Sequence, residues 1–192
     1  QWYLDMVPTG LVPALKFGEE LMWESADIMK ALEERFPTPS LFPMEDSQKK
    51  KLEELMNFAD ETLGKVGYAY IRNDVPEEEE AKRADIIGAF KTLEKQLEAS
   101  GGPFLLGSEL SMADISVMPS LERLAVQLPF FKNLTVRVPE GEEPPAENGG
   151  FPLLSQWFLA MEERPSYIQI REDPITLVKQ LLSDKSCIAV LS

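Results

Sequence analysis

The sequence predicts a small α/β unit followed by a larger all-helical domain. Residues 11–23 contain two short apolar runs separated by Gly18-Glu19-Glu20, which is typical of a β-hairpin. From Ser47 onward, apolar residues recur every three or four positions, which is typical of amphipathic helices. The chain has 192 residues, of which 44% are hydrophobic, and this length is enough to bury a sizeable core.

The α/β unit is expected to occupy residues 1–37. An aromatic and apolar stretch leads into the turn Pro8-Thr9-Gly10, and the elements expected after it are strands at 11–17 and 21–23 and a helix at about 24–35. An isolated hairpin is only marginally stable in water, and these strands are too apolar to remain exposed. We therefore expect further strands to complete the sheet, from residues upstream of Gln1 in preference to a partner.

A linker at 38–46 is expected to precede the helical domain, which covers 47–192. Apolar periodicity and helix start signals predict helices at about 47–72, 74–99, 112–127, 153–163 and 174–182. Asp74 is a possible N-cap of the second helix, because a proline follows in the first turn. Prolines and glycines among acidic residues mark 132–151 as an irregular loop.

Ser111 and Asp114 form a capping-box pattern in front of the helix expected at 112–127. In this motif the two side chains bond to N–H groups that the first helical turn leaves unpaired. We interpret both residues as structural and not as catalytic.

The composition excludes several classes of function. The 19 basic and 33 acidic residues give a net charge of −14, which disfavours binding to nucleic acid or to anionic lipid. There is no histidine, so a histidine triad, a histidine metal site and a histidine general base are excluded. No apolar run approaches the length of a membrane span, and no signal peptide is visible.

The single cysteine, Cys187, cannot form an internal disulfide, which favours a reducing compartment. We expect the cytoplasm, with the plastid stroma as an alternative. Cys187 lies in an apolar tail without a neighbouring base that would lower its pKa, so we interpret it as structural or incidental.

Four motifs, in this order along the chain, resemble those of the glutathione S-transferase family. They are Gly10-Leu11-Val12-Pro13-Ala14-Leu15, Leu21-Met22-Trp23-Glu24-Ser25, the helix at 26–37, and Phe104-Leu105-Leu106-Gly107 with the capping box behind it. The resemblance spans nearly the whole chain and implies a thioredoxin-like α/β domain, incomplete at its N-terminus, followed by a helical bundle. Trp2-Tyr3-Leu4 before the first motif is similar to the cysteine-using branches of the family, namely omega, lambda and dehydroascorbate reductase.

The resemblance implies a glutathione site made of Val12, Pro13, Glu24 and Ser25. A cis peptide bond before Pro13 would turn the Val12 backbone outward, where it could pair with the extended peptide. The Ser25 hydroxyl and N–H would hold the γ-glutamyl carboxylate, with Glu24 near the ammonium group. The alternatives are an ordinary X-Pro strand start at Val12-Pro13 and a plain helix cap at Ser25.

The implied function is that of a glutathione-dependent transferase or thiol reductase. The catalytic residue is expected upstream of Gln1, where serine or tyrosine would indicate conjugation and cysteine would indicate thiol exchange. The implied partners are glutathione, an apolar or disulfide co-substrate, and a second subunit in a homodimer or an assembly. The alternatives are a non-catalytic scaffold that keeps the fold, and a module that only sequesters glutathione or apolar ligands.

Overall fold

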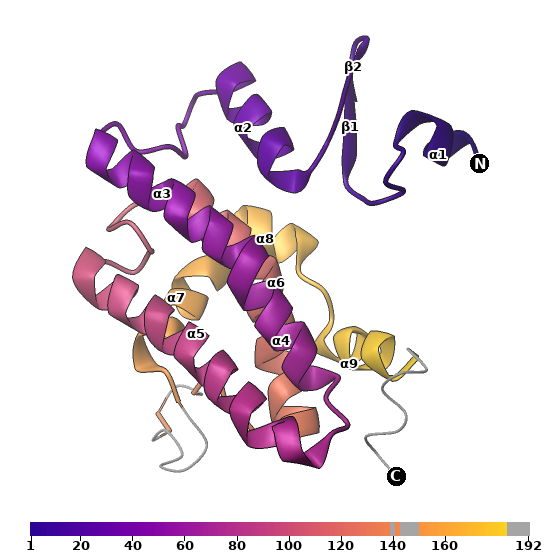
Figure 1. Cartoon of the computed structure of the whole chain (residues 1–192). Helices are drawn as coiled ribbons and strands as arrows, with labels where there is room; N and C mark the ends of the chain where they lie inside the picture. Colours follow the sequence, from indigo (N-terminus) through magenta and orange to yellow (C-terminus); the bar gives the residue numbers. More distant parts are fainter. Residues whose placement is uncertain (139–140, 143–149, 184–192) are drawn as a thin grey trace.

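The computed structural model describes residues 1–138, 141–142 and 150–183. Helix α1 (Trp2–Met6) comes first, followed by strands β1 (Ala14–Phe17) and β2 (Glu20–Trp23) and helix α2 (Ser25–Arg35). The two strands form an antiparallel sheet, in which Ala14 pairs with Trp23 and Phe17 with Glu20. This unit lies at one end of the molecule, next to the helices that form the rest of it (Figure 1).

The structure corrects one expected boundary in this unit and adds one element. The strand expected at 11–17 begins only at Ala14, because Pro13 has no N–H group to contribute to the ladder. Residues 2–6, which the sequence does not assign, are helical. Of the apolar side chains expected to be covered, Trp2 is 72% exposed, Val12 80% and Phe17 46%.

The first long helix of the helical domain has a change of winding near its middle. It consists of α3 (Asp46–Phe58), the π-helical segment η1 (Ala59–Leu63) and α4 (Gly64–Ile71). The sequence predicts the extent of this helix but not the π-helical segment. Next come the short 3-10 helix η2 (Pro76–Glu78) and α5 (Glu79–Ser100), whose N-cap is Glu78 and not Asp74 as expected.

The remaining helices are α6 (Met112–Lys132), α7 (Pro152–Glu162), α8 (Pro165–Ile170) and α9 (Pro174–Ser183). Helix α6 continues past the predicted end at 127 and includes Pro129, because the buried Leu124 and Leu128 anchor its last turns in the core. The sequence analysis missed α8, which is too short to show a periodic pattern. Residues 139–140 and 143–149 of the loop expected at 132–151, and the tail with Cys187, lie outside the described residues.

The core lies between the helices of the second unit. Its largest fully buried side chains come from α3, η1, α4, α5, α6, α7 and two connecting segments: Leu52, Leu63, Tyr70, Ile86, Phe90, Leu93, Leu105, Leu121, Leu128, Leu134, Leu154 and Trp157. Ala26 and Met29 of α2 and Leu41 and Phe42 of the linker pack against this core. The α/β unit is therefore anchored to the helical domain through α2 and the linker.

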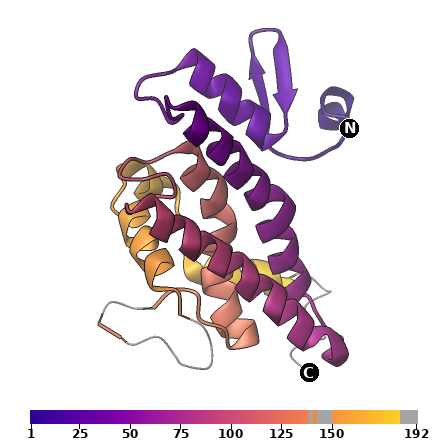
Figure 2. The same ribbon diagram turned by 60° about the vertical axis from the view of Figure 1, so that its left-hand side comes forward.

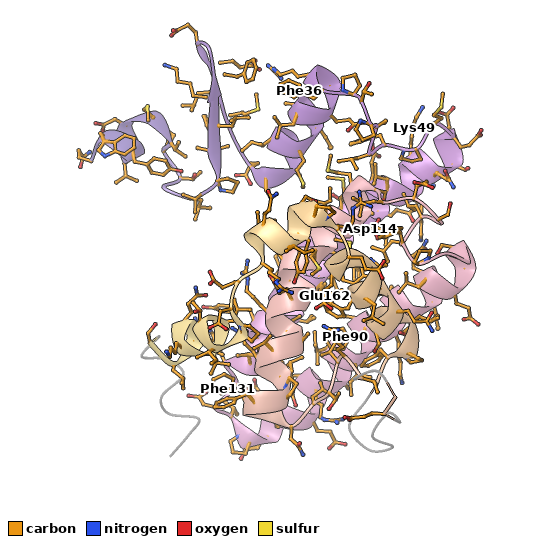
Figure 3. All side chains as sticks on the ribbon, turned by 180° about the vertical axis from the view of Figure 1, so that it is seen from behind. Phe36, Lys49, Phe90, Asp114, Phe131 and Glu162 are labelled. Carbon is orange, nitrogen blue, oxygen red and sulfur yellow. The ribbon has the colours of Figure 1, made fainter. Side chains whose placement is uncertain are left out.

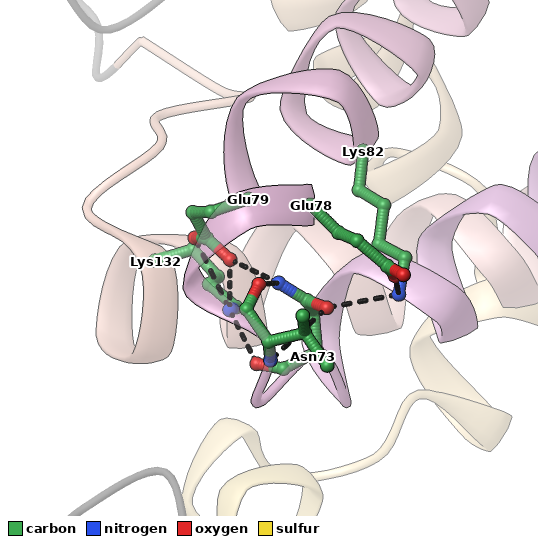
Figure 4. Close-up of polar contacts among 6 residues, drawn as sticks. Asn73, Glu78, Glu79, Lys82 and Lys132 are labelled. Carbon is green, nitrogen blue, oxygen red and sulfur yellow. Dashed lines mark hydrogen bonds and ion pairs between the residues drawn. The ribbon is translucent and has the colours of Figure 1, made fainter.

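A partly buried polar network ties the start of α5 to the end of α6 (Figure 4). The Asn73 side chain donates to Glu79 Oε2 at 2.8 Å, and Lys132 Nζ lies 2.9 Å from the same oxygen and 3.2 Å from the Asn73 carbonyl oxygen. Burial raises the pKa of the Glu79 carboxyl, but the hydrogen bonds from Asn73 and Lys132 and the charge of Lys132 outweigh it. The pKa of Glu79 is therefore lower than usual.

Candidate functional site

The residues singled out by the first two motifs lie at the open end of the β-hairpin. Because Ala14 pairs with Trp23, Val12-Pro13 immediately precedes the last pair of the ladder and Glu24-Ser25 immediately follows it. The turn at Gly18 points away from the helical domain, whereas the open end faces it (Figure 2). We call Val12, Pro13, Glu24 and Ser25 the hairpin-end site.

The first half of the hairpin-end site is an exposed stretch of backbone. The peptide bond between Val12 and Pro13 is cis, as the resemblance implies. Within the described residues, the Val12 N–H and C=O have no hydrogen-bond partner. The preceding loop is fixed by the Tyr3 hydroxyl, which donates to the Leu11 carbonyl oxygen, and by the fully buried Val7. This segment therefore presents unpaired backbone groups from a supported position.

The second half of the hairpin-end site is the N-terminus of α2. Glu24 is the N-cap and Ser25 is the first helical residue, and no side chain caps the helix. Within the described part of the chain, the exposed Ser25 hydroxyl has no hydrogen-bond partner. The interpretation of Ser25 as a plain helix cap therefore does not apply. The N–H groups of the first turn and the partial positive charge of the helix end remain available to a ligand.

The backbone at Glu24 adopts an unusual conformation, with φ of 86° and ψ of 112°. A positive φ is unfavourable for a residue with a side chain, and such residues are concentrated at functional sites. Asp27, in the same first turn, adds a second exposed carboxylate that the sequence analysis did not single out. Together these residues present two carboxylates beside free N–H donors, an arrangement suited to a zwitterion.

The other end of α2 is fixed by contacts that the sequence analysis missed. Arg35 pairs with Glu20 on the hairpin and lies over the Phe17 ring, 4.9 Å from its centroid. Glu33 accepts hydrogen bonds from linker groups, including the Leu41 N–H at 3.0 Å. The Leu41 carbonyl oxygen in turn accepts from the Met112 N–H at 2.9 Å. These bonds link α2 through the linker to the start of α6.

The start of α6 contains the capping box of Ser111 and Asp114. One oxygen of the fully buried Asp114 carboxylate accepts from Ser111 N–H and Oγ–H at 2.9 and 2.7 Å. The other accepts from the Leu105 N–H and from Trp157 Nε1, both at 2.8 Å. Asp114 lies inside the helical domain (Figure 3), so its carboxylate joins three segments and has no access to a ligand.

Several cavities in the helical domain could receive a second ligand, and two of them differ clearly in the residues that line them. One, of about 260 Å³, lies between α4, α6 and α9 and is lined by Gly64, Gly67, Tyr68, Ile71, Arg72, Ser120, Arg123, Leu124, Gln127, Gln180 and Leu181. The other, of about 430 Å³, lies between α6, α7 and α8 and is mostly apolar, with Glu122, Arg164 and Arg171 in its wall. The lining residues of the smaller cavity include two arginines and no acid, so we call it the arginine-lined cavity.

The described residues offer no group of three or more potential metal ligands. Among the same residues, no helix combines the length and the apolar character needed to cross a bilayer.

Comparison with known proteins identifies the family. Residues 1–40 match the model of the glutathione S-transferase N-terminal domain, and residues 76–160 match that of the C-terminal domain. Glutathione S-transferase L3 of Arabidopsis thaliana is 31% identical over 182 residues, which cover 93% of this chain and 68% of that protein. The chain belongs to the glutathione S-transferase family. The resemblance stated from the four motifs is therefore confirmed.

Other members of the glutathione S-transferase family are similarly related. Glutathione S-transferase L1 of A. thaliana is 33% identical over 175 residues, 90% of this chain and 65% of that protein. Glutathione S-transferase DHAR2 of A. thaliana is 31% identical over 136 residues, 71% of this chain and 59% of that protein. The chain thus spans about two thirds of the length of these curated relatives.

Solved structures of glutathione S-transferases share the fold. Glutathione transferase Omega 3C of Trametes versicolor superimposes with a TM-score of 0.69 at 22% identity, covering 90% of this chain and 72% of that one. Dehydroascorbate reductase of Chlamydomonas reinhardtii superimposes with a TM-score of 0.71 at 23% identity, covering 95% of this chain and 76% of that one. The predicted fold class, a thioredoxin-like part followed by a helical domain, is confirmed.

Proposed function

We propose that this glutathione S-transferase family member binds glutathione at the hairpin-end site and uses it in thiol chemistry, as a thiol reductase or a transferase. The observation that carries the proposal is that, at one end of the hairpin, the Val12 backbone and the Ser25 hydroxyl have no hydrogen-bond partner among the residues that the structure describes. The 31% identity to a protein named DHAR2 supports thiol reduction as one of these two activities.

Each part of glutathione has a complementary group in this site. The cysteinyl unit would pair with the N–H and C=O of Val12, as an added strand does. The γ-glutamyl carboxylate would accept from the Ser25 hydroxyl and from N–H groups at the start of α2. The γ-glutamyl ammonium would lie near the carboxylates of Glu24 and Asp27. The site thereby matches both charges of the γ-glutamyl end.

We propose that the co-substrate binds in the arginine-lined cavity of the helical domain. In thiol exchange, the glutathione thiolate attacks one sulfur of a disulfide, the S–S bond breaks, and the departing thiolate takes up a proton. During this exchange the negative charge passes from the attacking sulfur to the departing sulfur. Guanidinium groups such as those of Arg72 and Arg123 would stabilise the charge on the departing sulfur. The cavity between α6, α7 and α8 suits this charge less well, because Glu122 lies in its wall.

We further propose a reducing compartment, either the cytoplasm or the plastid stroma. Reduced glutathione and an unpaired cysteine both fit such a compartment. Glutathione S-transferase L2 of A. thaliana, named as chloroplastic, is 28% identical over 181 residues.

Calorimetric titration of the full-length protein with glutathione tests the proposal. Ser25→Ala should raise the Kd about tenfold or more, equivalent to roughly 1.4 kcal/mol, because a hydroxyl donor to a carboxylate is removed. Ser47→Ala is the matched control, since Ser47 is also an exposed serine in the first turn of a helix, α3, with no partner in the described residues. Equal affinity of both variants and the wild type would exclude the hairpin-end site.

Turnover separates the possible activities. We expect the full-length protein to reduce the mixed disulfide of glutathione and 2-mercaptoethanol faster than it conjugates an aryl halide. The reverse order would assign it as a conjugating transferase. Binding of glutathione without either reaction would favour the scaffold or sequestering function.

A further inference from the structure

Gly64, the first residue of α4, lies directly after the π-helical segment and lines the arginine-lined cavity. Its N–H donates to the carbonyl oxygen of Ala59, five residues earlier, and so closes the π-helical turn. The residues on the same helical face, Gly67, Tyr68 and Ile71, line the same cavity. The π-helical segment therefore sets which residues of α4 face the cavity.

The two glycines of this face differ in what surrounds them. A Cβ on Gly67 would lie 2.7 Å from Leu124 Cδ2, so any larger residue would force the buried Leu124 side chain of α6 to move. A Cβ on Gly64 would lie 3.5 Å from the Ala59 oxygen and 3.7 Å from Ser120 Oγ, which are ordinary contacts. Gly64 is not required for packing, and its negative φ does not require glycine.

Glycine in a helix is less stable than alanine, so packing and helix propensity give no reason for glycine at position 64. The remaining effect of having no side chain at position 64 is on the cavity. Without a side chain there, the cavity wall stays open between α4 and Ser120 of α6. We infer that Gly64 determines the size of the co-substrate, by leaving room for a bulky apolar group that a large side chain at this position would exclude. This inference rests on the proposed function, because it takes the arginine-lined cavity as the co-substrate site.

Binding of glutathione and of S-hexylglutathione, compared in the same full-length protein, tests this inference. The hexyl group represents the apolar part of the co-substrate. The Kd of glutathione divided by the Kd of S-hexylglutathione measures how much the cavity adds to the affinity. In Gly64→Leu we expect this ratio to fall about tenfold, with the Kd of glutathione itself unchanged. Gly64→Ala should lower the ratio less and should raise the Tm.

Gly88→Leu is the matched control. Gly88 is an exposed helical glycine in α5 with nothing within 4 Å of an added Cβ, and it does not line the cavity. An unchanged ratio in Gly64→Leu, or an equal loss in Gly64→Leu and Gly88→Leu, would overturn the inference. If the wild type binds neither ligand, the proposed function itself fails; if glutathione binds and the ratio is insensitive to position 64, only the role of Gly64 fails.

Discussion

Helices α2 and α6 both begin with a serine and an aspartate, yet the two starts are used in opposite ways. At α6, Ser111 and Asp114 are buried and bond to one another, to the Leu105 backbone and to Trp157. At α2, Ser25 and Asp27 are exposed, and neither side chain has a partner in the described part of the chain. The residue types are the same, but Ser111 is the N-cap and forms a capping box with Asp114, whereas Ser25 is the first helical residue and is not an N-cap.

This difference shows which helix start can receive a ligand. Every orphan N–H group at a helix start needs a partner, from a side chain, from water or from a ligand. At the start of α6, the Ser111 N–H donates to Asp114 and the Met112 N–H donates to the Leu41 carbonyl oxygen, so these groups have partners within the protein. At the start of α2, a ligand can bond to the exposed N–H groups without breaking a hydrogen bond within the described part of the protein. We therefore assign binding to Ser25 and stability to Asp114.

The largest expected effect is that of Asp114→Asn on stability. The amide cannot accept all four hydrogen bonds that the carboxylate accepts, and at least one buried donor is left unpaired. We expect a loss of about 3–5 kcal/mol in the free energy of unfolding, measured by chemical denaturation. Asp27→Asn, at the same third helical position of α2, should change it by less than about 0.5 kcal/mol.

If Asp114→Asn does not fold, Ser111→Ala provides a measurable substitute. It removes one side of the capping box and should cost about 1–2 kcal/mol. Similar losses for the substitutions at Asp27 and Asp114 would show that the start of α2 is as structural as that of α6.

A third helix start, that of α5, allows an intermediate effect to be tested. Glu79 bonds to Asn73 and to Lys132, whose side chain is only 5% exposed. Glu79→Gln should cost about 1–2 kcal/mol at pH 7, between the values for exposed and buried ion pairs. The loss is smaller than for Asp114 because the Asn73 carbonyl still accepts from Lys132.

The pH dependence of this cost follows from the lowered pKa of Glu79. In the unfolded chain the carboxyl titrates near its usual value of 4.5, and in the folded protein it titrates below that. The stability that the carboxylate contributes is therefore complete above about pH 4.5 and is lost as the pH falls through the folded pKa. Denaturation curves of wild type and Glu79→Gln should converge on acidification; a constant difference would contradict this assignment.

The sequence predicts the helices with long apolar periodicity and misses features that depend on distant partners. Periodicity predicts the helix at 47–72, but it cannot distinguish a π-helical segment within the helix from regular winding. The pairing of Glu79 with Lys132 joins residues 53 positions apart, and no local pattern indicates it. Its residue type and the following proline make Asp74 a possible cap, whereas the chain forms a 3-10 turn first and α5 begins after Glu78.

For the candidate site, the motifs single out the residues and the hairpin register explains why they lie together. Val12-Pro13 and Glu24-Ser25 come to one end because the strands between them pair from Ala14 with Trp23. The sequence gives no indication of Gly64, because a glycine within a helical pattern can be tolerated for many reasons. Which glycine is needed for packing and which lines a cavity depends on the distances to α6.

The smallest expected effect concerns Glu24, where stability and binding should change in opposite directions. Glycine adopts a positive φ readily, so Glu24→Gly should raise the free energy of unfolding by about 0.5–1 kcal/mol. The same change removes a carboxylate from beside the proposed ammonium position and should weaken glutathione binding. Glu19→Gly is the control: Glu19 is also exposed, but its φ is not positive, so glycine there should lower stability slightly and leave binding unchanged. If Glu24→Gly instead lowers stability and leaves the Kd unchanged, the glutamate side chain supports the fold, and the contrast between the starts of α2 and α6 is smaller than proposed.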